Sequence, residues 1–117
     1  MTTDTITNDW TSVAETITVC RADELPEGQM RLVEAGERKI GVFRCGDGEL
    51  YAIEDRCSHD DGPLAEGEFD AGACTVECPR HGSLFDLRSG RPKTLPAFQP
   101  VDIFAARVED GEVKLEV

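Results

Sequence analysis

Two short segments, CSHDDGPL at residues 57–64 and CPRHGSLFD at residues 78–86, govern the interpretation of the whole chain. Each offers one cysteine and one histidine, spaced as C-x-H and C-x-x-H, and the two histidines of the chain both lie here. Glycine and proline beside both pairs indicate tight turns. The candidate ligands of a single metal site are therefore Cys57, His59, Cys78 and His81.

Two thiolates and two imidazoles suit two kinds of metal site. One is a tetrahedral zinc ion, and the other is a [2Fe–2S] cluster with two cysteines on one iron and two histidines on the other. Structural zinc sites usually take like ligands from each segment, whereas each segment here mixes the two types. A mixed pair lets each loop reach both irons. The spacing favours the cluster, with a zinc site or unliganded core residues as the alternatives.

The pattern C-x-H…C-P-x-H-G-S-x-F-D resembles the Rieske [2Fe–2S] domain, over roughly residues 16–117. The segment that runs from Arg88 to Pro96 resembles the proline loop that covers the cluster in that family. The resemblance implies one cluster, with Cys57 and Cys78 on the inner iron and His59 and His81 on the outer iron. It also implies a surrounding shell made of Leu64, Pro79, Gly82, Ser83, Pro92 and Pro96.

The chain departs from the Rieske proteins of respiratory complexes in ways that bear on its reduction potential. Those proteins carry an extra cysteine in each loop, where this chain has Gly62 and Arg80, and a tyrosine where it has Phe85. Ser83 is retained, and we expect its hydroxyl to donate a hydrogen bond to a bridging sulfide. Fewer hydrogen bonds to sulfur stabilise the reduced state less. We therefore expect a potential in the lower part of the range of roughly −150 to +300 mV.

Short segments of β-favouring residues, separated by turns such as Asp47-Gly48 and Asp110-Gly111, predict an all-β fold. The predicted strands are 16–20, 30–34, 38–45, 50–54, 73–77, 101–108 and 112–117. Frequent short strands are typical of an antiparallel sandwich or small barrel. The family resemblance adds a small cluster-binding subdomain, at about 56–88. We expect residues 1–14 to be an extended or disordered lead-in and 15–117 to be a single Rieske domain.

The remaining cysteines and the N-terminus bear on the compartment. Cys20, Cys45 and Cys74 are predicted to be buried small apolar side chains rather than a disulfide framework. The first ten residues have no basic start and no apolar core, so no signal peptide is expected. No apolar run reaches the length of a transmembrane helix. These features favour a reducing cytoplasm.

The net charge and the number of histidines exclude several classes of function. The chain has 12 Lys and Arg against 24 Asp and Glu, a net charge of −12, which argues against nucleic acid and anionic membranes as partners. The acidity is either a solubility feature or a face that steers docking to a basic partner. A Rieske oxygenase needs a further iron bound by two histidines and a carboxylate, and both histidines are already assigned. No G-x-G-x-x-G dinucleotide motif is present.

The sequence therefore predicts an electron-transfer protein, not an enzyme. We expect a soluble, monomeric one-electron carrier that passes electrons from a flavin reductase to a terminal oxygenase of the aromatic-ring dioxygenase type. Both partners are expected to dock at the cluster tip. Two alternatives remain open. One is a Rieske ferredoxin that serves iron–sulfur assembly or acts as a nitrite-reductase small subunit, and the other is a zinc-stabilised binding module with no redox role.

Overall fold

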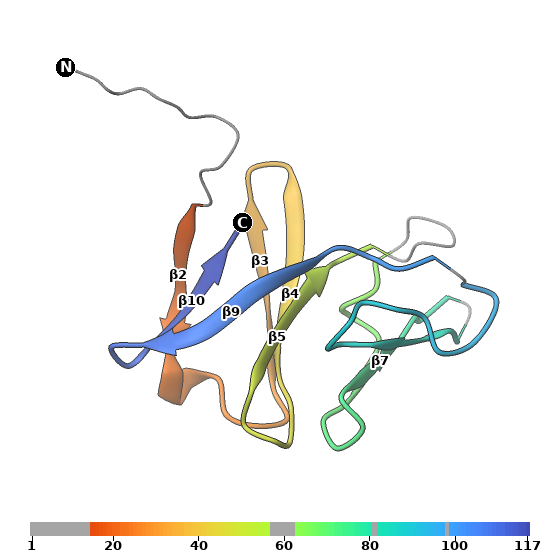
Figure 1. The fold of residues 1–117 in the computed structure, drawn as a ribbon, viewed down its shortest axis with the longest axis horizontal. Helices are drawn as coiled ribbons and strands as arrows, with labels where there is room; N and C mark the ends of the chain where they lie inside the picture. The colour runs from red at the N-terminus through yellow and green to blue at the C-terminus, as the bar shows by residue number, and fades with distance from the viewer. Residues whose placement is uncertain (1–14, 57–62, 81, 98) are drawn as a thin grey trace.

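A computed structural model of the chain describes residues 15–56, 63–80, 82–97 and 99–117. The described residues form nine strands and one 3₁₀ turn at Ala22–Glu24 (Figure 1). The strands are β2 (Thr16–Arg21), β3 (Met30–Ala35), β4 (Arg38–Arg44), β5 (Leu50–Glu54), β6 (Glu68–Asp70), β7 (Thr75–Glu77), β8 (Leu84–Asp86), β9 (Ile103–Glu109) and β10 (Glu112–Glu116). The all-β prediction is confirmed. Among the described residues, no helix is long and apolar enough to span a membrane.

Six strands form one antiparallel sheet in the order β2-β10-β9-β5-β4-β3. Every one of them sends apolar side chains into the same core cluster. The fully or largely buried members are Cys20, Leu25, Ile40, Val42, Leu50, Ala52, Val113 and Leu115, and residues of β3 and β9 pack against them. Because a single core receives side chains from all six strands, the sheet curls around its own interior and is close to a barrel.

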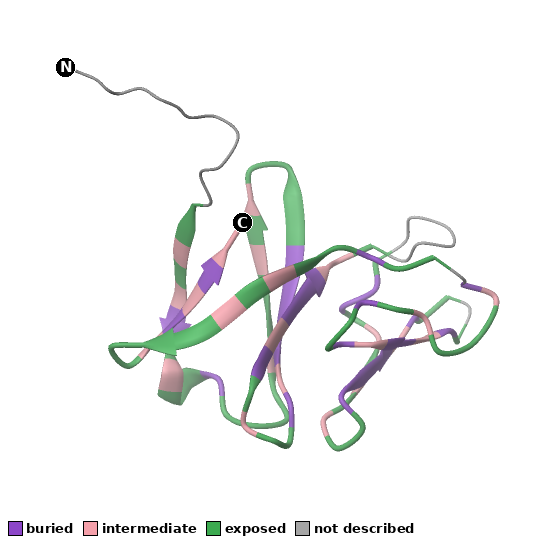
Figure 2. Ribbon diagram, in the orientation of Figure 1, coloured by how far each residue is buried: buried purple, intermediate pink, exposed green. Residues whose placement is uncertain are grey.

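Strands β4 and β5 are buried on both faces, which explains their nearly continuous apolar sequences. Successive residues of a strand point to opposite faces. Ile40 and Val42 of β4 therefore enter the core of the six-stranded sheet, while Phe43 enters a second cluster on the outer face. Figure 2 shows the long buried stretches of these two strands. Their outer face is covered by the segment that carries the ligand boxes.

That second segment folds into a three-stranded antiparallel sheet in the order β6-β7-β8. The strand predicted for 73–77 corresponds to β7, whereas β6 and β8 were not predicted. The second core cluster joins this small sheet to β4 and β5. It contains Phe43, Cys45, Ile53, Leu64, Ala65, Cys74, Val76, Cys78, Phe85, Leu87, Ala97 and Val101. The candidate ligand Cys78 thus belongs to the core that holds the two sheets together.

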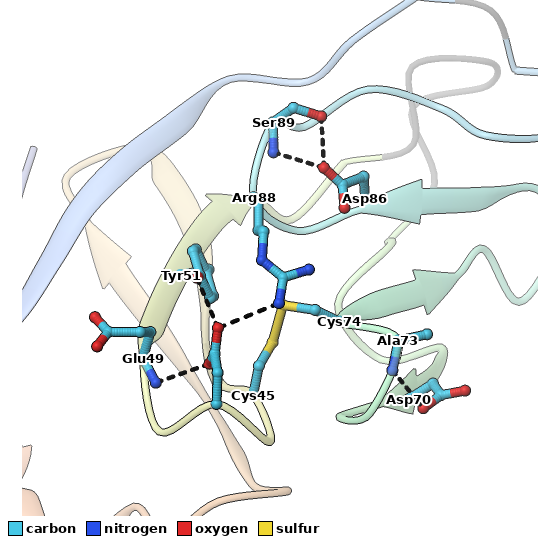
Figure 3. Close-up of a disulfide and its surroundings, with 10 residues drawn as sticks. Cys45, Glu49, Tyr51, Asp70, Ala73, Cys74, Asp86, Arg88 and Ser89 are labelled. Atoms are coloured by element: carbon cyan, nitrogen blue, oxygen red, sulfur yellow. Dashed lines mark hydrogen bonds and ion pairs between the residues drawn. A yellow bond between two sulfur atoms is a disulfide. The ribbon is translucent and has the colours of Figure 1, made fainter.

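The expectation that Cys45 and Cys74 are simple buried thiols is wrong. The two residues form a disulfide with a Cα–Cα distance of 5.4 Å, between the end of β4 and the turn before β7 (Figure 3). Their burial was predicted correctly, since both are fully buried. Cys74 also lies in the turn with a φ of 59°, not in the strand predicted for 73–77. The inference of a reducing compartment from unpaired cysteines therefore loses its basis.

A polar contact lies beside the disulfide and connects the same two parts of the fold. Asp47, in the β4–β5 turn, accepts hydrogen bonds from the Glu49 backbone N–H (2.9 Å), the Tyr51 hydroxyl (3.1 Å) and the Arg88 guanidinium (3.2 Å). The pKa of Asp47 is lowered, mainly by the Glu49 N–H and then by Arg88 and Tyr51. Arg88 also lies over the Tyr51 ring, 5.4 Å from its centroid. The chain after β8 is therefore held against the β4–β5 hairpin.

Replacing both Cys45 and Cys74 by alanine should lower the free energy of unfolding by about 3 kcal/mol, because the disulfide closes a long loop in the unfolded chain. The sequence separation of the two residues is 29. Denaturant unfolding of the double variant and of the wild type measures this difference. Intact-mass spectrometry with and without reductant shows whether the bond is present. Equal midpoints for the two proteins would contradict a stabilising role.

Candidate metal centre

Asp55 joins the described residues on either side of the first ligand box. Its Oδ1 accepts hydrogen bonds from the backbone N–H groups of Leu64 (2.9 Å) and Ala65 (2.7 Å). Cys57 and His59 lie between these anchor points but outside the described residues. Asp55 was not identified from the sequence. An aspartate directly before a glycine- and proline-containing loop is the only sequence feature that pointed to this role.

The second ligand box is a closed turn. The Cys78 N–H donates to the Ser83 carbonyl at 2.8 Å, and the Gly82 N–H donates to the Cys78 carbonyl at 2.9 Å. Gly82 has a φ of 76°, a conformation that favours glycine. Cys78 is a fully buried free cysteine, while Pro79 and Arg80 are exposed. His81 lies outside the described residues. The turn therefore buries the Cys78 thiol and exposes the chain that follows it.

The stems of the two boxes touch at Gly67. A Cβ atom at this position would lie 1.6 Å from the Glu77 carbonyl oxygen and 3.1 Å from Pro79 Cδ. Gly67 follows the first box and donates its N–H to the Leu64 carbonyl at 3.0 Å. Only a residue without a side chain permits this approach. The contact places the chain leaving the first box directly against the chain entering the second.

The proline segment (residues 91–100) is tied to the second box, whose last three residues form β8. The Lys93 N–H donates to the Leu84 carbonyl at 2.6 Å, and Pro92 forms a β-bridge with Phe85. The Ala97 N–H donates to the hydroxyl oxygen of buried Ser83 at 3.1 Å. The predicted covering loop is therefore held close to the second box by backbone and side-chain hydrogen bonds.

The structure brings together most of the predicted shell. Leu64 and Cys78 share one core cluster, and Ser83, which is fully buried, bonds the residue after Pro96. Pro79 and Gly82 belong to the turn itself and are exposed. The other free cysteine of the described residues, Cys20, lies in the core of the six-stranded sheet, where burial raises the pKa of its thiol. Cys78 alone combines a buried free thiol with the second box.

Comparisons with known proteins agree with this arrangement. The profile of the Rieske [2Fe-2S] domain family matches residues 15–105. The anthranilate 1,2-dioxygenase ferredoxin subunit of Burkholderia cepacia is 43% identical over 95 residues, which cover 81% of this chain and 85% of that protein. The ferredoxin of carbazole 1,9a-dioxygenase from Nocardioides aromaticivorans IC177 superposes with a TM-score of 0.79 at 33% identity, covering 86% of this chain and 95% of that one.

A second solved structure shows a similar chain in a larger assembly. It is the complex of reduced oxygenase and oxidized ferredoxin in carbazole 1,9a-dioxygenase, and its matching chain has a TM-score of 0.78 at 36% identity. The match covers 86% of this chain and 91% of that one. The chain therefore belongs to the Rieske [2Fe-2S] domain family. It carries one Rieske [2Fe–2S] cluster and is an electron-transfer protein rather than an enzyme.

The described residues fit such a cluster. A thiolate ligand needs a cysteine in a shielded pocket, and Cys78 is fully buried in a self-closed turn. The hydroxyl oxygen of fully buried Ser83 accepts from the Ala97 N–H, and the same hydroxyl has one proton to donate. A buried hydroxyl proton needs an acceptor, and a cluster sulfide beside this turn would supply one.

Replacing Ser83 by alanine should lower the reduction potential of the cluster by about 60 mV. A hydrogen bond to a charged acceptor is worth about 1.5 to 3 kcal/mol, and it strengthens when reduction adds a negative charge to the cluster. A strengthening of about 1.4 kcal/mol is a tenfold change in equilibrium constant, or 59 mV for a one-electron couple. The sign is negative because the hydroxyl stabilises the reduced, more negative cluster. Protein-film voltammetry measures the shift. Ser89→Ala is the control, since Ser89 is exposed and bonded to Asp86, and an equal shift in both variants would contradict the assignment.

Proposed function

We propose that Cys57, His59, Cys78 and His81 are the four ligands of the cluster. The described geometry supports this set through the buried thiol of Cys78 and through the two stems, which are closed by Asp55 and fixed at Gly67. When bound, the cluster accepts and releases one electron at a time. The protein's own residues shield it, since Leu64 of the first box and Phe85 of the second are fully buried.

The chain carries electrons from a flavin reductase to a terminal oxygenase that hydroxylates aromatic rings. The observation that supports this assignment best is the 43% identity to a dioxygenase ferredoxin subunit, over 85% of that protein's length. The two histidines of these 117 residues are both used in the proposed ligand set. A second, catalytic iron site of the two-histidine, one-carboxylate type therefore has no histidines left to form it.

The cytoplasm is the proposed compartment and a monomer the proposed state. The Cys45–Cys74 disulfide is compatible with a reducing compartment, because both residues are fully buried. Cell fractionation and size-exclusion chromatography with light scattering test the two statements.

Reconstitution tests the proposed function. The purified protein is combined with a flavin-dependent ferredoxin reductase, NADH and a ring-hydroxylating oxygenase from a related system, and product formation is followed. We expect hydroxylated product only when this protein is present, with one electron transferred per cluster in each cycle. The assignment would be refuted if the reduced protein passes electrons to no ring-hydroxylating oxygenase tested but does pass them to a nitrite reductase. That result would favour the alternative client.

A further inference from the structure

Charge is distributed unevenly along the chain. Residues 78–100 carry four Lys and Arg against one Asp, a net charge of +3, whereas the whole chain has −12, which leaves −15 for the rest. This cationic part contains the second ligand box and the proline segment. The proline segment is bonded to that box through Ala97 and Ser83. The stretch that contains the second box and the proline segment is therefore cationic within an acidic chain.

Two of these four cations, Arg91 and Lys93, are free to meet a partner. Both are exposed, and neither forms an ion pair or a side-chain hydrogen bond with any residue that the structure describes. Arg88 differs, because its guanidinium is paired with Asp47 at 3.2 Å. Unpaired cations next to one another repel each other. Two exposed cations at neighbouring positions attract a negatively charged group.

Arg91 and Lys93 border a pocket of about 290 Å³ on the proline segment. Thr94, Pro92 and Pro100 also line it, together with Leu95, whose exposed fraction of 77% is the highest among the large apolar side chains described. The pocket therefore offers two positive charges beside one exposed apolar group. An apolar contact surrounded by charged groups is a common anchor in protein recognition.

We propose that this cationic groove (Arg91, Lys93 and Leu95) docks an acidic segment of a redox partner protein, in which carboxylates lie next to an apolar side chain. The inference rests on the proposed electron-carrier function and adds the chemistry of the partner's contact surface. The remaining −15 charge repels the same segment from the rest of the molecule. The charge separation therefore turns the groove, and the ligand box beside it, toward the partner.

Carboxylates on one side of Lys93 mark the end of the cationic groove. Lys93 also borders a hollow lined by Glu68, Asp70 and Glu77, to none of which it is ion-paired. These carboxylates would repel an acidic segment from that side. Arg91, which does not line this hollow, carries the larger share of the attraction. The acidic docking face expected from net charge alone would favour the opposite, basic partner.

The test measures binding of a fluorescently labelled hexaglutamate peptide by anisotropy at low ionic strength, with the full chain. We expect the wild type to bind and the Arg91→Glu, Lys93→Glu double variant to bind at least about tenfold more weakly. The control is Arg31→Glu with Lys39→Glu, which makes the same charge change at exposed positions of β3 and β4. The control should stay within about twofold of the wild type, and binding of the wild type should weaken as salt rises.

Three results would overturn the proposal: no binding by the wild type, equal weakening in both double variants, or tight binding of hexalysine without binding of hexaglutamate. If the glutamate variant does not fold, the Arg91→Gln, Lys93→Gln variant replaces it, with an expected loss of several fold. An absorption spectrum of each sample keeps the two claims separate. Colourless protein that still binds hexaglutamate would support the groove and refute the electron carrier.

Discussion

Cys78→Ser abolishes the brown colour and the electron paramagnetic resonance signal of the protein, with cluster content falling at least about tenfold. The reason is the ligand chemistry, because a thiolate binds iron in such clusters and a serine hydroxyl does not ionise near neutral pH. Cys78 is the buried free cysteine of the second box. Iron and sulfide analysis of the purified variant measures the loss.

Cys20→Ser is the matched control for this substitution. Cys20 is the other free cysteine of the described residues and is also buried, with an exposed fraction of 8%, but it lies in the core of the six-stranded sheet. The control should keep its full cluster content and lose at most about 1 to 2 kcal/mol of stability through burial of a hydroxyl. A variant of Cys78 that retains two irons and two sulfides would show that the proposed ligand set is wrong.

Gly67→Ala should unfold or severely destabilise the cluster region, by about 3 kcal/mol or more. The added Cβ would lie 1.6 Å from the Glu77 carbonyl oxygen, so the two backbone segments must separate. No side-chain rotation relieves a clash between a Cβ and a backbone atom. The loss of stability should therefore reach or exceed the upper end of the range of about 1 to 3 kcal/mol that is typical of overpacked cores. Since these segments are the stems of the ligand boxes, cluster content should fall together with stability.

Gly72→Ala provides the comparison. An added Cβ at Gly72 would meet its nearest atom, Asp70 Oδ1, at 3.5 Å, an ordinary contact. Its effect on stability should remain within about 0.5 kcal/mol. Thermal unfolding followed by circular dichroism, with iron content measured on the same samples, distinguishes the two variants. Similar behaviour of both would mean that the stems are not in close contact at Gly67.

The long strands were predictable because alternation and turn residues are local features. The prediction for 50–54 coincides with β5, and that for 38–45 ends within one residue of β4. Strand β6 was not predictable in this way. Its three residues, Glu68–Asp70, contain one apolar side chain, and they form a strand only because β7 pairs with them. Pairing between segments, rather than local preference, defines so short a strand.

The disulfide and the role of Asp55 show a second limit. Cys45 and Cys74 are 29 residues apart, and they meet because the small sheet packs on the outer face of β4. Asp55 bonds residues nine and ten positions later. Both contacts depend on how loops close in three dimensions. The ligand candidates, by contrast, follow a fixed spacing in the sequence and could be named directly.

Net charge was the least informative feature of the sequence for docking. A value of −12 suggested one acidic surface, whereas Arg91 and Lys93, which form no ion pair with a described residue, border one pocket on the proline segment. The uneven distribution was present in the sequence. Which cations are paired could be learned only from the folded chain, where Arg88 meets Asp47 across 41 residues.

One measurement tests both the presence of the cluster and the nature of its ligands. Absorption and electron paramagnetic resonance spectra of the purified wild type are recorded before and after reduction with dithionite. We predict a brown protein that bleaches on reduction and then gives a rhombic signal with a low average g value, as expected for a cluster with mixed cysteine and histidine ligation. A colourless protein without a signal that contains one zinc ion per chain would contradict it.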